Sequence, residues 1–405
     1  MKNLWKHLAI LAMAVGGLIA MSAHADEPAV YRLEAPKPEV AMTPPMGWNS
    51  WNHFNCNIDE AKIRGAADAM AASGMKEAGY QYIIIDDCWQ VGRDAQGNIV
   101  ADPVKFPSGI KALADYIHSK GLKFGIYSDA GIKTCGGRPG SRGHEFQDAK
   151  QYAAWGVDYL KYDWCSTGGD DAQSDYRIMA MALRASGRDI VFSICEWGNH
   201  KPWEWAGDVG HLWRTTGDIS DAWVKNDKSK PWESGVLDLL DKQVGLEKYA
   251  GPNHWNDPDM LEVGNGGMTD NEYRAHFSLW AMLAAPLIAG NDLSNMSEAT
   301  KTILLNKDVI AVDQDTLGRE GHRVSKDGDF EVWARPLANG DTAVILLNRS
   351  AAPHSMTADW KALGLPAKKD VKDLWSKAVK KNVQTGYTAD VPSHAVVMIR
   401  VTPRP

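Results

Sequence analysis

The stretch YLKYDWC, residues 159–165, places a cation, a carboxylate and a thiol on alternate positions. If this stretch is a β-strand, Lys161, Asp163 and Cys165 share one face, because successive side chains of a strand point to opposite sides. The other face carries two aromatic residues. Polar groups gathered toward the carboxyl end of a strand indicate a sheet that carries a functional site along that edge.

Seven further stretches share this pattern, in which a short and largely apolar run leads to a carboxylate, a tryptophan or another polar residue. They are PPMGWNSW (44–51), QYIIIDD (81–87), LKFGIYSD (122–129), DIVFSICEW (189–197), HLWRTTGD (211–218), NHWNDPDM (253–260) and PLIAGND (286–292). Together with residues 157–164 they predict eight strands, of which the first and seventh have the weakest strand propensity.

Helical stretches lie between the predicted strands. They cover residues 59–75, 108–121, 144–156, 170–187 and 269–284. Asp59 and Ser108 are candidate N-caps, and Gly121 is a candidate stop. Strands that alternate with helices predict parallel βα units, and eight such units predict a (β/α)8 TIM barrel.

The carboxylates at the strand ends have a simpler explanation, because Asp after a strand is often only a helix cap or a turn residue. That explanation covers one or two of them. It does not account for Asp86 beside Asp87, or for Lys161 within a strand. The barrel mouth is therefore the predicted site, since active sites of this fold are built there.

The pattern changes after about residue 314. The short strand-like runs DFEVWARPL (329–337), DTAVILLNRS (341–350), VKDLWS (371–376) and AVVMIRVTP (395–403) are separated by turn signals. They predict a small antiparallel β-domain. We place the barrel at residues 43–315 and the second domain at residues 316–405.

The first 25 residues read as a signal peptide with a cleavage site after Ala25. The alternative, a membrane anchor, is weaker because the apolar run is short and small residues precede the cleavage site. Residues 26–42 read as a lead-in. We therefore expect an exported protein, periplasmic or secreted, with no membrane span once the signal is removed.

The composition is that of an ordinary globular protein, with a net charge of -7 that does not favour nucleic acid as a partner. The 17 Trp outnumber the 7 Phe, and indole faces suit packing on sugar rings. Five Cys follow the signal peptide, so four can pair and one is left over, with the pairing open. A zinc site is the weaker alternative, because no CxxC or HExxH spacing occurs.

Two carboxyl groups have neighbours that suit catalysis. Lys161, two residues before Asp163, should lower the pKa of that carboxyl and keep it ionised, as a nucleophile requires. Asp218 lies four residues beyond Arg214 and is a candidate general acid. Two carboxyls with these roles are typical of glycosidic bond cleavage, although each pair could equally be a structural salt bridge.

The remaining polar motifs are less specific. Asp86 and Asp87 can hold neighbouring sugar hydroxyls, and metal binding is the alternative use. The glycine-rich loop at residues 135–143 lacks the sequence of a phosphate-binding loop.

Nine motifs occur in order between Pro44 and Gly318. They are PPMGWNSW, IIIDDCW, GIYSDAG, TCGGRPGS, YLKYDWC, CEWG, WRTTGDI, WNDPDMLEVGN and NKDVIAVDQDTLG. The ordered set resembles the α-galactosidases of glycoside hydrolase family 27, and its CEWGNH stretch resembles the plant and bacterial members. The resemblance implies a C-terminal β-sandwich, no metal or organic cofactor, and an α-galactoside as the substrate. It does not imply an oligomeric state.

The resemblance also implies roles for single residues. Asp163 would be the nucleophile and Asp218 the acid/base. The remaining positions would shape the sugar subsite or its rim: Trp51, Asp86, Asp87, Tyr127, Cys135, Lys161, Cys165, Glu196, Trp197, Arg214, Asp259 and Met260. Asp257 would have a supporting role.

The resemblance implies two disulfides, Cys56–Cys88 and Cys135–Cys165. Members with a further disulfide pair the Cys of CEW with a position that is Gly210 here, so Cys195 would be free. The intact Asp86-Asp87 pair and Glu196 favour galactose over N-acetylgalactosamine or β-L-arabinopyranose as the sugar. A galactose-binding protein without catalysis and a metal-dependent barrel hydrolase are the alternatives from other classes.

Overall fold

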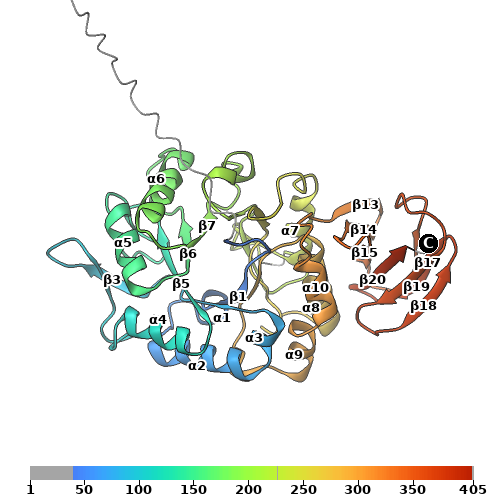
Figure 1. Cartoon of the computed structure of the whole chain (residues 1–405), viewed down its shortest axis with the longest axis horizontal. Helices are drawn as coiled ribbons and strands as arrows, with labels where there is room; N and C mark the ends of the chain where they lie inside the picture. The colour runs from blue at the N-terminus through green and yellow to red at the C-terminus, as the bar shows by residue number, and fades with distance from the viewer. Residues whose placement is uncertain (1–39, 226, 404–405) are drawn as a thin grey trace, which may run out of the picture. The chain divides into compact units, whose positions relative to one another are not determined.

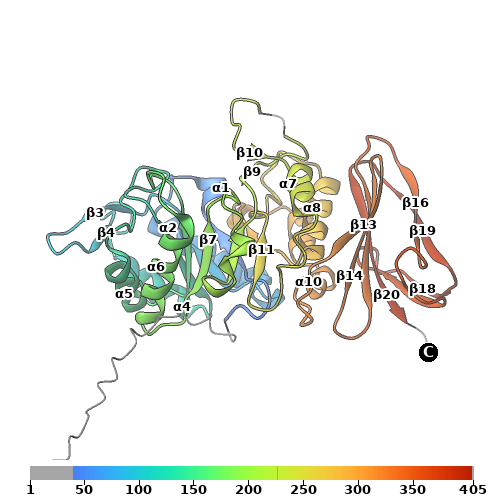
Figure 2. The same cartoon turned by 90° about the horizontal axis from the view of Figure 1, so that it is seen from above.

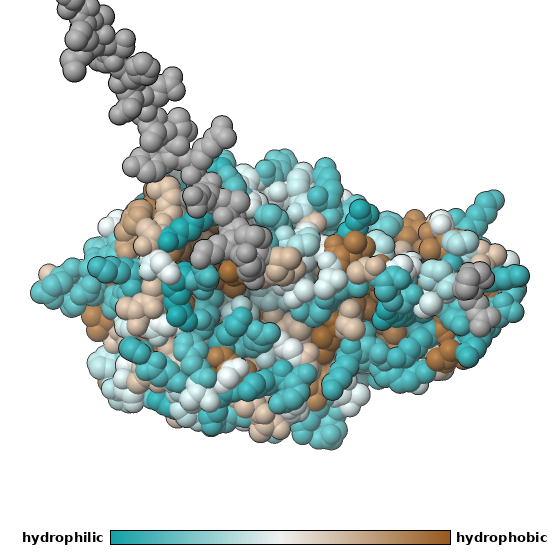
Figure 3. Space-filling model, in the orientation of Figure 1, coloured by the Kyte–Doolittle hydropathy of each residue, from teal (hydrophilic) through white to brown (hydrophobic). Residues whose placement is uncertain are grey.

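The structure, a computed structural model, describes residues 40–225 and 227–403. The predicted signal peptide (1–25) and most of the predicted lead-in (26–42) lie outside the described residues. Within the described part of the chain, no helix has the length and apolar character needed to cross a membrane. Figure 3 shows a largely hydrophilic face, with apolar side chains in small separate groups.

An eight-stranded parallel sheet forms the centre of the larger part of the structure (Figure 1). In chain order its strands are β1 (Met46–Asn49), β2 (Tyr82–Ile84), β5 (Lys123–Asp129), β6 (Tyr159–Asp163), β7 (Val191–Cys195), β8 (Leu212–Arg214), β11 (Trp255–Asp257) and β12 (Leu287–Ala289). Each lies inside one of the eight predicted stretches. Leu261 closes the sheet into a barrel, because its N–H donates to Ile288 at 2.8 Å and its carbonyl accepts from Gly290 at 3.0 Å.

Strand β6 has the predicted alternation of faces. Tyr159 packs inside the barrel with Tyr82, at 5.4 Å between ring centroids. Tyr162 points outward and packs edge-on against Tyr176 at 5.6 Å. Lys161 and Asp163 therefore share the inner face and lie at the barrel mouth, as the alternation predicts.

Helices cover the outside of the barrel. Five coincide with predicted helical stretches: α2 (Glu60–Ala72), α4 (Ile110–Ser119), α5 (Glu145–Trp155), α6 (Ala172–Ala185) and α8 (Asp270–Met282). The sequence did not predict α1 (Trp51–Phe54), α3 (Met75–Ala78), α7 (Val236–Gln243), α9 (Glu298–Leu304), α10 (Lys307–Asp313) or the 3-10 turns η1 (Pro202–Glu204), η2 (Ala206–Asp208) and η3 (Leu293–Asn295).

The predicted caps of these helices are partly right. Asp59 caps α2, because its carboxylate accepts from the Lys62 N–H at 2.8 Å. The predicted Ser108 cap of α4 is wrong. Gly109 is the N-cap, with φ of 80°, and the Ser108 N–H instead donates to Glu60 on α2 at 3.0 Å. Gly121 has a φ of 69° just past the end of α4, which fits its predicted role as a stop.

Two small β-elements lie at the barrel mouth. A hairpin of β3 (Gln90–Arg93) and β4 (Ile99–Ala101) follows β2. After β8, the short strands β9 (Asp218–Ile219) and β10 (Glu233–Ser234) pair in parallel and enclose a loop (Figure 2).

The C-terminal part is an antiparallel β-sandwich. One sheet has the order β13 (His322–Asp327), β14 (Phe330–Pro336), β15 (Thr342–Asn348), β20 (Ala395–Pro403), β17 (Lys369–Asp373) and β18 (Val379–Val383); β16 (His354–Asp359) pairs with β19 (Gly386–Val391). The sequence predicted β14, β15, β17 and β20. Buried Arg335 joins this part to the barrel, because its guanidinium donates to the Ala281 carbonyl at 2.7 Å.

Candidate active site

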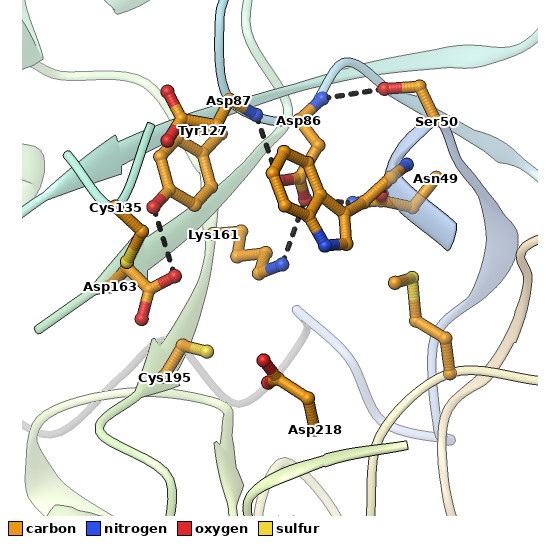
Figure 4. A network of polar contacts seen from close by, with 12 residues as sticks. Asn49, Ser50, Asp86, Asp87, Tyr127, Cys135, Lys161, Asp163, Cys195 and Asp218 are labelled. Carbon is orange, nitrogen blue, oxygen red and sulfur yellow. Dashed lines mark hydrogen bonds and ion pairs between the residues drawn. The ribbon is translucent and has the colours of Figure 1, made fainter. Parts of the chain in front are cut away.

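A cavity of about 1110 Å³ opens at the carboxyl ends of the barrel strands. The polar side chains predicted from β2, β5, β6 and β8 meet there, although they are far apart in the sequence (Figure 4). The predicted site residues that line the cavity are Trp51, Asp86, Asp87, Tyr127, Cys135, Lys161, Asp163, Cys165, Trp197, Arg214, Asp218, Asp259 and Met260.

Asp163 is a deep carboxylate that two donors hold in place. The Tyr127 hydroxyl donates to Asp163 Oδ2 at 2.9 Å, and the Trp164 N–H donates to Oδ1 at 3.0 Å. Burial raises the pKa of Asp163 to about 7, while Lys161 and the Tyr127 hydrogen bond act in the opposite direction. The residue is only 6% exposed, so its charge is poorly solvated.

The predicted net lowering of the Asp163 pKa by Lys161 is wrong, because burial dominates and Lys161 pairs with another carboxylate. Its Nζ lies 2.8 Å from Asp86 Oδ2, across the barrel interior. Burial alone would lower the pKa of Lys161, but the negative charge of Asp86 and of other acids raises it well above its ordinary value. Lys161 is therefore a cation that acts on Asp163 without a direct ion pair, and burial outweighs its effect on the Asp163 pKa.

The adjacent carboxylates Asp86 and Asp87 are spread over different donors. Asp86 Oδ2 accepts from Asn49 and from Lys161, each at 2.8 Å. Asp87 accepts from the N–H groups of Cys88 and Gly136, each at 2.6 Å. Protein donors thus fix both side chains at the cavity wall, and burial raises the pKa of Asp87.

The position of Gly136 explains why this part of the loop at residues 135–143 requires a glycine. A Cβ at this position would lie 2.9 Å from Asp87 Oδ2, which is too close for any side chain. The glycine lets the backbone N–H reach the carboxylate. The loop therefore positions a carboxylate of the cavity.

Asp218 lies at the outer side of the cavity. The Arg214 guanidinium contacts Asp218 Oδ1 at 3.1 Å and Asp259 Oδ2 at 3.0 Å. Arg214 is 3% exposed, whereas the Asp218 side chain is 43% exposed. Asp259 has a φ of 92° and accepts from the Ile219 N–H at 2.8 Å, so it also fixes the chain beside Asp218.

Disulfides hold the loops that carry the site. The structure joins Cys135 to Cys165 at the cavity wall and Cys56 to Cys88 behind Asp87, which are the pairings that the resemblance implies. Cys195 is a buried free thiol, and Arg214 approaches its sulfur at 3.5 Å.

Asp129 is a buried carboxylate to which the sequence assigned no role. It accepts from the N–H groups of Gly131 at 2.6 Å and Cys165 at 2.8 Å, so it ties the ends of β5 and β6 together. Burial, and then the charge of Asp163, raise the pKa of Asp129 to about 8. Together with Cys135 and Cys165 it forms the one cluster among the described residues with metal-ligand spacing, but the two sulfurs are joined in the disulfide.

Glu196 is the one predicted subsite residue that does not line the cavity. Its side chain is fully buried and accepts from the His200 N–H at 2.6 Å and from His200 Nδ1 at 2.8 Å. Strand β7 ends at Cys195, and Trp197 takes a left-handed φ of 59°, so Trp197 faces the cavity in its place. Asp257 does not line this cavity either; it is half-buried, and its carboxylate accepts from the Asp259 N–H at 2.9 Å.

The sequence did not predict several of the residues that line the cavity. They are Asn52, His53, Thr215, Thr216, Lys230, Trp232, Glu233, Glu262 and Asn265. Most lie on loops after strands, where no periodicity indicates which side chain turns inward.

Comparisons with known proteins agree with this geometry. Residues 43–315 match the model of a family described as alpha galactosidase A, and residues 327–401 match that of its C-terminal beta sandwich domain. The chain belongs to the α-galactosidases of glycoside hydrolase family 27. It is therefore a glycoside hydrolase by family.

Individual relatives can be aligned with this chain over most of their length. The chain is 54% identical to alpha-galactosidase A of Cellvibrio japonicus over 384 residues, which cover 90% of this chain and 93% of the relative. The crystal structure of alpha-galactosidase I from Mortierella vinacea is 42% identical with a TM-score of 0.88, over 90% of this chain and 98% of that one. The Saccharomyces cerevisiae α-galactosidase solved with raffinose is 31% identical with a TM-score of 0.86, over 91% and 100% of the two chains.

Proposed function

We propose that this protein is a retaining α-galactosidase that releases terminal α-linked galactose through a covalent intermediate on Asp163. The observation that carries the proposal is the contrast between two carboxyl groups in one cavity. Asp163 is deep and held by hydrogen bonds to both oxygens, while Asp218 lies toward solvent beside Arg214. One carboxylate is thus placed to attack and the other to exchange protons with a leaving group and with water.

In the first step, Asp163 Oδ attacks C1 of the galactosyl residue as the bond from C1 to the leaving oxygen breaks. Asp218 gives its proton to that oxygen, so the leaving group departs as an alcohol. Tyr127 and the Trp164 N–H orient the attacking carboxylate. A galactosyl ester of Asp163 forms, and the charge on this carboxyl is removed.

In the second step, ionised Asp218 takes a proton from a water molecule, which attacks C1 and displaces Asp163. Two inversions at C1 leave the product in the α-configuration. Lys161, Asp86 and Asp87 supply a cation and two carboxylates at the opposite wall of the cavity, where they can bind the sugar hydroxyls.

The sugar itself is part of the proposal. A β-L-arabinopyranoside lacks the hydroxymethyl group of galactose, and an N-acetylgalactosaminide adds an acetamide. The high identity to curated α-galactosidases supports galactose over both. We further propose that residues 1–25 direct export to the periplasm or medium, and that the catalytic and C-terminal domains are residues 43–315 and 316–405.

The test compares Asp163→Asn with Asp218→Asn on p-nitrophenyl α-galactoside, with the β-L-arabinopyranoside and α-N-acetylgalactosaminide in parallel. Each substitution should lower kcat by about 10²–10⁴ or more. Azide should restore turnover in both variants but give different products. The Asp163 variant should give β-galactosyl azide, from direct displacement, and the Asp218 variant should give α-galactosyl azide, from the intermediate. The same azide anomer from both variants would contradict the assigned roles.

A further inference from the structure

Trp232 is an exposed aromatic residue that also lines the cavity. It is 58% exposed, yet its side chain forms part of the cavity wall. Isolated exposed apolar residues are ordinary on protein surfaces and need no explanation. An indole in the wall of a mostly polar cavity is different, because it offers a flat apolar face to whatever enters.

Trp232 is tied in space to Asp218. Strand β10 begins at Glu233, the next residue, and Glu233 is the register partner of Asp218 in β9. The Trp232 carbonyl packs against Gly217, where a Cβ would lie only 2.6 Å from that oxygen. The end of the loop that leads into β10 is thus held beside the residues that carry Asp218, while the rest of the loop projects from the barrel (Figure 2).

Polar contacts hold this end of the loop. Lys230 Nζ contacts Glu233 Oε1 at 2.8 Å, and the Glu233 N–H donates to the Lys230 carbonyl at 3.1 Å. Lys225 Nζ donates to the Pro231 carbonyl at 2.9 Å. The backbone that carries the indole is therefore held in place before a ligand arrives, which reduces the entropy lost on binding.

Three carboxylates give the cavity a direction. Asp163 and Asp86 are 6% and 1% exposed and mark its deep end, whereas Asp218 marks its outer side. A general acid must lie beside the oxygen that leaves, so the leaving group lies on the Asp218 side. Under the proposed function, on which this step rests, a leaving sugar would pass beside Trp232.

We infer that Trp232 is a stacking platform for the leaving-group sugar, and that it forms a second subsite for neutral α-galactosyl oligosaccharides. The indole would cover the apolar face of the pyranose ring attached to galactose. Lys230 and Glu233 line the same part of the cavity and can bind hydroxyls at the ring edge. The platform contributes to substrate selection without touching the reacting atoms.

The experiment uses two substrates that differ only in the leaving group. Melibiose carries glucose at the leaving position, while α-galactosyl fluoride carries a single atom that cannot stack. In Trp232→Ala, kcat/KM for melibiose should fall about five- to tenfold, because one ring face loses its apolar cover. The value for the fluoride should stay within about twofold, since no sugar reaches the indole.

Two further variants control for folding and for loss of an aromatic ring. Trp232→Phe keeps a flat ring and should retain most of the melibiose activity. Phe146→Ala, at a 51% exposed aromatic position on α5 outside the cavity, should leave both substrates unchanged. Light scattering on each variant reports the oligomeric state.

An equal loss on both substrates, or no loss on either, would overturn the inference. A change of oligomeric state in Trp232→Ala with the ratio between substrates unchanged would also overturn it, because the indole would then be covered by a second copy. Failure of the proposed function would look different: the wild-type protein would hydrolyse neither melibiose nor the fluoride.

Discussion

The hydrogen bond from Tyr127 to Asp163 makes a quantitative prediction about pH. Burial raises the pKa of Asp163 to about 7, and the Tyr127 hydroxyl, at 2.9 Å, is one of the groups that keep it from rising further. A hydrogen bond to a charged group contributes about 1.5–3 kcal/mol, and one pKa unit corresponds to about 1.4 kcal/mol. Tyr127→Phe should therefore raise the Asp163 pKa by about one to two units.

The sign follows from the proposed role of Asp163 as a nucleophile. Attack needs the ionised carboxylate, so activity is present above its pKa and is lost as the pH falls through it. A higher pKa in Tyr127→Phe moves the acid limb of the kcat/KM profile toward higher pH. The free-enzyme profile reports this pKa directly.

The assay is a pH profile of kcat/KM for p-nitrophenyl α-galactoside, with Tyr80→Phe as the matched control. The Tyr80 hydroxyl is also buried and donates one hydrogen bond, to the Leu304 carbonyl at 2.9 Å, but it lies outside the cavity. The control should lose some stability and keep the wild-type acid limb. An acid limb that stays within about 0.3 units in Tyr127→Phe, or that moves to lower pH, would refute the reasoning about Asp163.

Three further predictions concern stability, loop geometry and metals. Burial raises the Asp163 pKa to about 7 from an ordinary 3.8, so the ionised carboxylate destabilises the free protein. Asp163→Asn should therefore raise the free energy of unfolding, measured by urea denaturation, by about 2–4 kcal/mol near pH 7.5. The gain should vanish by about pH 4, where the carboxyl group of the wild type is protonated in the folded protein. A gain that did not depend on pH would contradict this explanation. Gly136→Ala should displace Asp87 and raise KM for the α-galactoside about tenfold, while the circular dichroism spectrum stays unchanged. Gly137→Ala is the control, because a Cβ at this position would meet open space. Its positive φ should cost a little stability, but KM should stay near the wild-type value. Equal KM values in the two variants would count against the clash with Asp87. Finally, EDTA should leave activity unchanged, and a loss that divalent metal restores would favour a metal-dependent mechanism.

The barrel strands were predictable because their chemistry is local. Runs such as YII in β2 and FGIY in β5 are largely apolar and are followed by a carboxylate two residues later, so each strand and its functional end are visible in a short window. Strands β13 and β18 of the sandwich were missed for the opposite reason. Most of their side chains are exposed, so no apolar alternation identifies them.

The partners of the charged residues could not be predicted from spacing. Lys161 and Asp163 share a face of β6, but positions two apart along a strand are about 6.6 Å apart. Asp86, 75 residues away in sequence, comes within 2.8 Å because the barrel brings the ends of β2 and β6 to one mouth. Contacts of this kind depend on closure of the whole sheet.

Glu196 and Trp232 show the same limit in loops. Glu196 was predicted at the sugar subsite, but β7 ends one residue earlier and the turn at Trp197 directs the carboxylate to His200. Trp232 reaches the cavity only because β10 pairs with β9. Neither outcome follows from periodicity, because the conformation of a loop is set by the elements that it packs against.

The central claim is that Asp163 forms a covalent bond with the sugar, so that hydrolysis retains configuration at C1. Proton NMR of the first galactose released from p-nitrophenyl α-galactoside, recorded before mutarotation, tests it most directly. The account predicts α-galactose as the first product, with the β-anomer appearing only later at the rate of mutarotation. β-Galactose as the first product would show a single inversion at C1 and would contradict Asp163 as the nucleophile.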